Sequence, residues 1–182
     1  IFSKEDDNQQ GGIVDKIHIL DSILSTLQKD IYNIITKNHI NICHFALSWI
    51  NLFFCQQFKI NDILRLWDVI FSESDRYYFV YYFSIAILQF KKEKIEKEEF
   101  CVIVHELQHT EIDNIDEVIK LAISIKNKYE KNVEEIILKQ SKVKEDIDEE
   151  DIDYIDYDEI IHYFYFDKYY HMNIFLTCED MD

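Results

Sequence analysis

The near absence of residues that break regular structure is the feature that most constrains how this chain can fold. Among its 182 residues there is no proline, and the two glycines, Gly11 and Gly12, are adjacent. An all-β domain needs many tight turns, which are built largely from glycine and proline. A chain of this length can bury a sizeable core as one domain. We therefore expect a mostly helical domain.

The charge of the chain is acidic and unevenly distributed. The formal net charge is -17 at pH 7, and from Glu145 to Ile160 ten of sixteen residues are acidic and none is basic. A chain with this balance lacks the positive field that attracts nucleic acids or anionic membranes. We expect a protein partner, with no nucleic acid and no membrane insertion.

The four cysteines show no metal-binding or disulfide pattern. Cys43, Cys55, Cys101 and Cys178 are widely spaced without a CxxC pair, so we expect reduced, buried thiols in an intracellular protein. No apolar run reaches the roughly 18 to 20 residues that span a bilayer, and no signal peptide is recognisable. Because the chain begins at Ile1 without methionine, we expect it to be a piece of a longer protein.

Apolar residues at helical spacing predict a series of helices. The segment from Ile13 to Lys37 predicts one or two helices with a break near Lys29. A helix from Asn41, which can act as its cap, presents an apolar face that includes both Phe45 and Trp49. Asn61 or Asp62 can cap the next helix, whose apolar face is predicted to hold Ile63, Leu66, Trp67, Ile70 and Phe71.

After Ser74, apolar residues at helical spacing predict three more helices. Ser74 or Asp75 can cap an aromatic helix from Arg76 to about Lys91, which is apolar nearly all round and therefore expected to be buried. A shorter helix from Phe100 to about His109 should turn Phe100, Val104 and Leu107 inward. Asn114 and Glu117 resemble a capping box that opens a long helix reaching about Lys139, with an apolar face of Ile115, Val118, Ile119, Ala122, Ile123 and Ile125.

These patterns divide the chain into four parts. Residues 1–12 read as a flexible lead-in and residues 13–140 as the helical domain. Residues 141–160 read as an acidic linker because their like charges repel one another. Residues 161–182 are rich in aromatic side chains, and either dock back on the domain or pair with another chain.

Two metal-binding patterns are incomplete. His105-Glu106-Leu107-Gln108-His109 matches the HExxH pattern, in which two histidines one helical turn apart bind zinc. A metzincin continuation would need Gly at position 112 and His at position 115, where this chain has Ile112 and Ile115. The acidic run lacks the glycine and the final glutamate of a calcium-binding EF-hand loop. We expect no metal and no cofactor.

The segment from Phe45 to Leu88 resembles the carboxyl-terminal lobe of a TBC domain, the module that activates the GTPase activity of Rab proteins. That family carries an aromatic helix with a tryptophan, then a Leu-Arg-Leu-Trp-Asp block, then a further aromatic helix. The resemblance extends over about Leu20 to Ile125, and one departure is Ser48, where the family usually has arginine. The matching residues are Phe45, Ala46, Trp49, Phe58, Ile63, Leu64, Arg65, Leu66, Trp67, Asp68, Phe71, Phe79, Ala86 and Leu88.

The resemblance also implies a mechanism. In this family an arginine from an IxxDxxR motif and a glutamine from a YxQ motif enter the active site of the bound Rab. Both motifs belong to the amino-terminal lobe, and the chain contains no Tyr-x-Gln and only two arginines, Arg65 and Arg76. The nearest approach to the arginine motif, from Lys59 to Arg65, lacks the isoleucine.

The resemblance predicts an all-α, multi-helix bundle that forms the C-terminal half of a TBC domain. The full-length protein would be a cytoplasmic GTPase activator in vesicle trafficking, peripheral to endomembranes through its Rab partner, and this chain alone would be inactive. The alternative is a non-catalytic helical interaction module, either a degenerate TBC domain or an unrelated adaptor. No catalytic residue is predicted, and the expected scaffold residues are Phe45, Trp49, Leu64, Arg65, Leu66, Trp67, Asp68 and Phe71. Arg65 and Asp68 can pair with each other or cap neighbouring helices.

Overall fold

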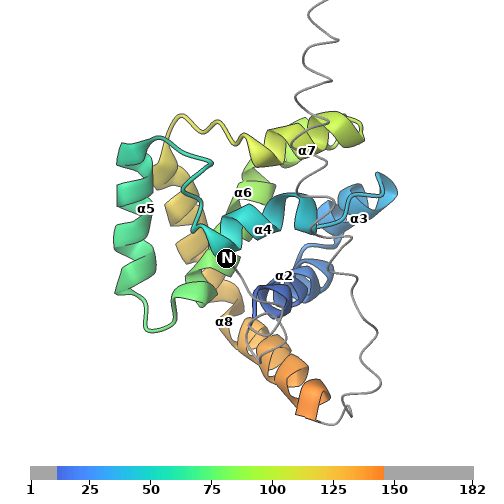
Figure 1. The fold of residues 1–182 in the computed structure, drawn as a ribbon, viewed down its shortest axis with the longest axis vertical. Helices are drawn as coiled ribbons and strands as arrows, with labels where there is room; N and C mark the ends of the chain where they lie inside the picture. The colour runs from blue at the N-terminus through green and yellow to red at the C-terminus, as the bar shows by residue number, and fades with distance from the viewer. Residues whose placement is uncertain (1–11, 146–182) are drawn as a thin grey trace, which may run out of the picture. The chain divides into compact units, whose positions relative to one another are not determined.

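A computed structural model describes residues 12–145 of the chain, the side chains of 142–145 excepted. Over these residues it contains seven helices and no strand, which confirms the predicted all-α class (Figure 1). The chain divides into one unit of residues 1–142 and another of residues 143–182, and the description below concerns the first. No helix in the described part of the chain is both long and apolar enough to cross a membrane.

The first two helices confirm the predicted break. α2 spans Ile13–Leu27 and α3 spans Lys29–Lys37, with Gln28 between them in a non-helical conformation (φ -132°, ψ 53°). The backbone hydrogen bonds continue across the break, because Gln28 N–H donates to the Leu24 carbonyl and the Gln28 carbonyl accepts from Tyr32 N–H, both at 2.9 Å. α2 and α3 therefore form a bent pair that buries Leu20, Ile23, Leu24, Ile31 and Ile35.

The next two helices carry the two tryptophans. In α4, Cys43–Asn51, the Asn41 side chain accepts a hydrogen bond from Cys43 N–H at 2.9 Å, as its predicted capping role requires. α5, Ile60–Ser72, begins earlier than predicted, so Asn61 and Asp62 lie in its first turn and no side chain caps it. The cap prediction for α5 was wrong because two polar residues in the first turn resemble a cap in sequence.

α6, Arg76–Ile95, is the helix against which most of the others pack. It contacts α2, α3, α4, α5 and α7, and lies between its neighbours in Figure 1. Every residue from Phe79 to Leu88 is buried, which confirms the burial expected of a helix that is apolar nearly all round. Asp75 caps α6 as predicted by accepting from Tyr77 N–H at 2.9 Å.

The last two helices show where the apolar pattern misled the prediction. α7, Phe100–Gln108, buries Ile103, Val104 and Leu107, whereas Phe100 is exposed. α8, Ile115–Glu145, starts with Asn114 accepting from Asp116 N–H and donating to the Glu117 carboxylate. The first bond is the predicted cap. The second joins the side chains of Asn114 and Glu117, whereas a capping box would join Glu117 to the Asn114 backbone N–H. Ile123, predicted on the buried face of α8, is exposed instead.

Only part of the predicted division into four segments falls within the residues that the structure describes. α8 continues to Glu145, five residues into the segment expected to be an acidic linker. The remainder of that segment, the aromatic segment 161–182 and the lead-in up to residue 11 lie outside the described residues. Their assignments stay predictions.

The expectation that the cysteines are buried was wrong for two of them. Cys43 is half-buried in α4, but Cys55 and Cys101 are exposed, and all three are free thiols. Cys55 lies in the turn after α4 and Cys101 on the outward side of α7, so apolar neighbours in sequence did not put them in the core. Cys178 lies outside the described residues.

Candidate functional site

Trp49 joins α4 to the end of α7. Its side chain is completely buried, and its indole N–H donates to the carbonyl of Leu107 at 3.1 Å. Leu107 lies in the last turn of α7, where backbone carbonyls have no partner within the helix. Gln108 makes a second link in the same place, because its side-chain amide donates to the His44 carbonyl of α4 at 2.8 Å. α4 and the end of α7 are thus held together at two points.

Trp67 joins α5 to the turn that follows α4. Its indole N–H donates to the Phe53 carbonyl at 2.9 Å. Phe53 and Phe54 both have left-handed backbones, with φ of 46° and 64°, which is uncommon for residues other than glycine. Trp67 was predicted to face the core, but it is only half-buried and packs against the core from its margin.

Arg65 joins α5 to the start of α8. Of the two pairings predicted for it, the structure shows contact with a neighbouring helix rather than with Asp68: Arg65 Nε lies 2.9 Å from Asp116 Oδ1. Both side chains are 49% exposed, so this ion pair stabilises the fold only weakly. Asp68 is exposed and forms no ion pair with any other described residue.

The other predicted scaffold residues separate into a buried and an exposed pair. Phe45 and Leu66 are completely buried, whereas Leu64 and Phe71 are each 51% exposed. The prediction that Phe71 faces the core was wrong. The buried residues of α5 are Ile63, Leu66 and Ile70, and a helix turns by about 100° per residue, so Phe71 points away from that line.

Ser48, the position that departs from the TBC pattern, takes part in a local polar contact. Its hydroxyl donates to the Phe45 carbonyl and accepts from the Gln57 side-chain amide, both at 3.1 Å. Gln57 is 8% exposed, and its side-chain oxygen has no hydrogen-bond partner among the described residues. An uncharged serine–glutamine pair therefore stands where the family usually places an arginine.

In the HExxH segment the two histidines contact each other, whereas Glu106 contacts two lysines of α6. The His105 and His109 rings lie 4.8 Å apart, with His105 half-buried and His109 exposed. Glu106 points elsewhere, to ion pairs with Lys91 (3.5 Å) and Lys94. No group of three or more His, Cys, Asp or Glu side chains in the described part of the chain is arranged to hold a metal ion.

The lysine pair controls the ionisation of Glu106. Burial raises the pKa of its carboxyl group, but the hydrogen bond from Lys94 and the charges of Lys91 and Lys94 outweigh burial and lower the pKa below its ordinary 4.5. Lys91 is itself buried and also donates to the Glu111 carbonyl at 2.8 Å. This cluster connects α6, α7 and the loop that precedes α8.

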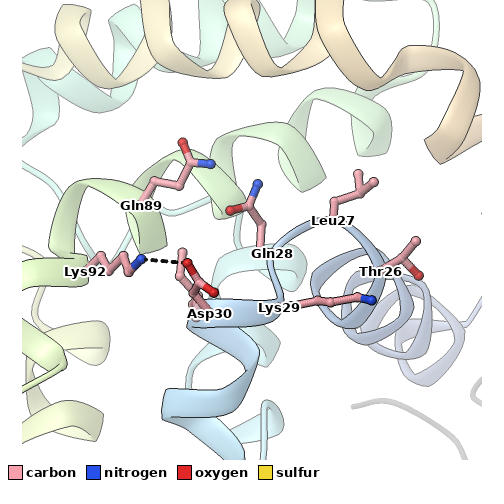
Figure 2. A pocket seen from close by; sticks show the side chains of 8 residues that line it. Thr26, Leu27, Gln28, Lys29, Asp30, Gln89 and Lys92 are labelled. Carbon is pink, nitrogen blue, oxygen red and sulfur yellow. Dashed lines mark hydrogen bonds and ion pairs between the residues drawn. The ribbon is translucent and has the colours of Figure 1, made fainter.

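A hollow of about 560 Å³ lies where the α2–α3 break meets α6. Figure 2 shows Lys92 extending from α6 towards Asp30, with Gln28 and Gln89 beside them. The Lys92 and Asp30 side chains are 3.1 Å apart, and that of Asp30 is 79% exposed. The lining contains no buried charge, and we assign no ligand to this hollow.

Sequence reasoning missed several residues of these contacts. Asp116, Gln57, Lys91 and the carbonyl of Phe53 were not singled out, although each partners a residue or segment that was. Their partners lie nine to fifty-one positions away in the chain. Local spacing carries no signal for such contacts.

A family model and several curated relatives match this chain, and two of the relatives are given below. The model, described as Rab-GTPase-TBC domain, matches residues 5–96, which is half of the chain. TBC1 domain family member 13 of Homo sapiens is 27% identical over 121 residues, which cover 66% of this chain and 30% of that protein. The GTPase-activating protein GYP1 of Saccharomyces cerevisiae is 27% identical over 67 residues, which cover 37% of this chain and 10% of that protein. The chain thus spans less than a third of either relative.

A solved structure shares the fold. The crystal structure of the Ypt/Rab-GAP domain of Gyp1p matches with a TM-score of 0.56 and 20% sequence identity. The match covers 73% of this chain but 39% of that one. At this identity the likeness concerns the arrangement of helices.

Proposed function

The chain belongs to the Rab-GTPase-TBC domain family, and on that premise we propose that it is the C-terminal part of a domain that stimulates GTP hydrolysis by a Rab-family GTPase. The full-length protein would carry the activity, and this part would act as scaffold. Three structural features support that role: the Trp49, Trp67 and Arg65 side chains each join two separate segments. The protein would be cytoplasmic and reach endomembranes through its Rab partner.

The positions of the two arginines are the observation that carries the proposal. Acceleration of phosphoryl transfer by a GTPase activator typically needs a cation that offsets the charge developing on the phosphate. Arg65 is paired with Asp116, and the Arg76 guanidinium lies 6.0 Å from the centre of the Phe71 ring. Neither belongs to the arginine motif of the family, and the chain has no Tyr-x-Gln motif. We infer that the catalytic arginine and glutamine are supplied from outside this chain.

Single-turnover GTP hydrolysis tests the proposal. A panel of GTP-loaded Rab proteins should hydrolyse GTP at their intrinsic rates when excess chain is added, and Arg65→Ala and Arg76→Ala should change nothing. The same chain joined to the upstream residues of its parent protein should accelerate at least one member of the panel. A robust acceleration by the chain alone, lost in either arginine variant, would assign an arginine finger to this part and overturn the proposal.

A non-catalytic interaction module is the second candidate, and the Ser48–Gln57 contact favours it. An uncharged pair in place of an arginine indicates divergence from the active family pattern. If the parent protein also lacks the two motifs, it should bind a GTP-loaded Rab without accelerating hydrolysis. Binding measured beside turnover in the same preparation distinguishes the two candidates.

A further inference from the structure

One side of α5 is apolar and accessible. Ile60, Leu64 and Phe71 are 66%, 51% and 51% exposed. With the half-buried Trp67 they follow one another at spacings of four, three and four residues, which places them along one side of the helix. We call these four residues the α5 strip. In the view of Figure 1, α5 lies at one edge of the described helices, where a second molecule can reach it.

The aromatic half of the strip is held in place by the fold. The Trp67 indole donates to the Phe53 carbonyl at 2.9 Å, and the Phe71 ring contacts the rings of Trp67 and Phe53 at centre distances of 5.8 and 6.2 Å. Side chains that are already fixed lose little conformational entropy when a partner covers them. The strip is therefore a preorganised surface.

The spacing of the strip is symmetric. Spacings of four, three and four residues read the same from either end of the helix, and they are the spacings of the a and d positions of a coiled coil. If a second copy of α5 runs antiparallel to the first, Ile60 of one copy lies opposite Phe71 of the other, and Leu64 lies opposite Trp67. The strip can therefore pair with itself.

The side-chain sizes favour the antiparallel orientation. In that orientation each of the four layers combines one aliphatic and one aromatic side chain, so the layers are similar in thickness. A parallel pair would place Trp67 against Trp67 and Ile60 against Ile60, which differ greatly in thickness. Two packed helices stay about 8 to 10 Å apart, and facing positions fill that space best when large residues meet small ones.

The polar residues beside the strip suit the same orientation. Asn61 and Asp68 are exposed and lie seven residues apart on the flank of the strip. In an antiparallel pair, flanking residues of this kind face each other, so the Asn61 amide of one copy can donate to the Asp68 carboxylate of the other. This contact occurs twice. Although the net charge of the chain is -17, the pairing sets no carboxylate directly against another along this flank.

We propose that the α5 strip is a two-fold symmetric interface between two copies of this chain, with their α5 helices antiparallel. A two-fold interface uses the same surface of both copies, which must be complementary to itself. Stable interfaces bury about 800 Å² on each partner, and four partly exposed side chains supply less. We therefore expect a weak dimer with a dissociation constant of about 10 to 100 μM. This interface is independent of any activity towards a Rab.

Sedimentation equilibrium of the full chain tests the proposal. Between about 5 and 500 μM the mean mass should rise from that of a monomer towards that of a dimer, in about 0.15 M salt to screen the repulsion between copies. Ile60→Lys and Phe71→Glu should each weaken the dimer at least about tenfold, because each places a charge in an apolar layer. The control Leu138→Lys changes a residue of α8 that is 59% exposed and should leave the dimer intact.

A mixture of the two strip variants tests the orientation. In an antiparallel pair the new lysine of the Ile60→Lys copy lies opposite the new glutamate of the Phe71→Glu copy, so an equimolar mixture should form heterodimers more tightly than either variant forms homodimers. A parallel pair would bring these positions to opposite ends, and mixing would restore nothing. Because both replaced side chains are exposed, circular dichroism should show unchanged helix content in both variants.

Four results would overturn the proposal. A monomer at every concentration would show that the strip does not pair with itself. A dimer that both strip variants leave intact would place the interface elsewhere, and a mixture that regains no affinity would exclude the antiparallel arrangement. A dimer that disappears when the upstream residues of the parent protein are joined to the chain would assign the strip to those residues.

Discussion

At the scale of single residues, the two tryptophans make the same kind of hydrogen bond in different surroundings. Each indole donates to a backbone carbonyl near the end of a helix, Trp49 to Leu107 and Trp67 to Phe53. The Leu107 carbonyl also accepts from the Thr110 hydroxyl, so it keeps a partner without Trp49. Trp49 is completely buried, whereas Trp67 is half-buried.

This difference predicts the effect of replacing each tryptophan by phenylalanine. Trp67→Phe removes one hydrogen bond at a solvent-accessible site and should lower the free energy of unfolding by about 1 kcal/mol. Trp49→Phe should cost more, about 2 to 3 kcal/mol, because it also leaves a space in a close-packed core. Urea denaturation followed by circular dichroism measures both values. A larger loss for Trp67→Phe would contradict these assignments.

The direction of each side chain was predictable where a helical face was regular. Spacing in the sequence indicated the burial of Phe45, Trp49 and Leu66, and the structure agrees. It failed for Ile123 within α8. It also failed for Phe71 and Phe100, which lie at the last turn of α5 and the first turn of α7. At a helix end no further turn supplies a neighbour to cover the side chain, so apolar character alone does not decide burial.

At the scale of helices, the cluster of Lys91, Lys94 and Glu106 connects α6 to α7. Glu106 accepts from both lysines, and Lys91 continues to the Glu111 carbonyl in the loop after α7. A buried lysine that lost its carboxylate partner would be costly, because its charge would remain away from water. The cluster should therefore contribute to stability while Glu106 is ionised.

The lowered pKa of Glu106 predicts how that contribution depends on pH. A carboxyl group whose pKa is lower in the folded protein stabilises it above the unfolded value of 4.5 and loses this effect as the pH falls through the folded value. The unaltered chain should therefore be more stable than Glu106→Gln at pH 7, and the difference should shrink below pH 4.5.

Thermal unfolding of both proteins between pH 7 and pH 3 measures the difference. Asp30→Asn is the matched control, because its ion pair with Lys92 is largely exposed and should have little effect at any pH. A difference between the unaltered chain and Glu106→Gln that grows as the pH falls would show that Glu106 is not held ionised by the two lysines.

Helix positions were largely predictable, whereas the links between helices were not. Asn41, Asp75 and Asn114 act as caps where the sequence indicated them, because capping depends on residues within a few positions of one another. The Arg65–Asp116 pair spans fifty-one positions, and the chain has many carboxylates that could have served equally well. Only the fold, which brings the start of α8 to Arg65, selects Asp116.

At the scale of the whole chain, charge and core occupy different parts of the sequence. Up to Lys142 there are seventeen basic and twenty-two acidic residues, a net charge of -5, and beyond it two basic and fourteen acidic residues, a net charge of -12. Every described buried apolar residue lies between Ile17 and Val133. The helical core therefore lies in the less charged part of the chain.

A chain of residues 12–142 should accordingly fold without the rest. Because buried residues of all seven described helices belong to one hydrophobic cluster and α6 contacts five of the other helices, unfolding should occur in one cooperative step. Circular dichroism and tryptophan fluorescence, which report on helix content and on the core, should give coincident urea transitions. Two separated transitions would show that the helices form more than one stable unit.

The left-handed turn at Phe53 and Phe54 has a consequence for the order of folding. Each of these residues adopts a backbone region that costs about 1 kcal/mol or more for residues other than glycine, and the carbonyl between them is held by Trp67 of α5. The turn keeps local backbone hydrogen bonds, such as that from Phe54 N–H to the Trp49 carbonyl at 3.1 Å, but the bond that holds the Phe53 carbonyl forms only when α5 packs against the end of α4. The two helices should appear together in the folding transition state, and substitutions in the turn should slow refolding rather than speed unfolding.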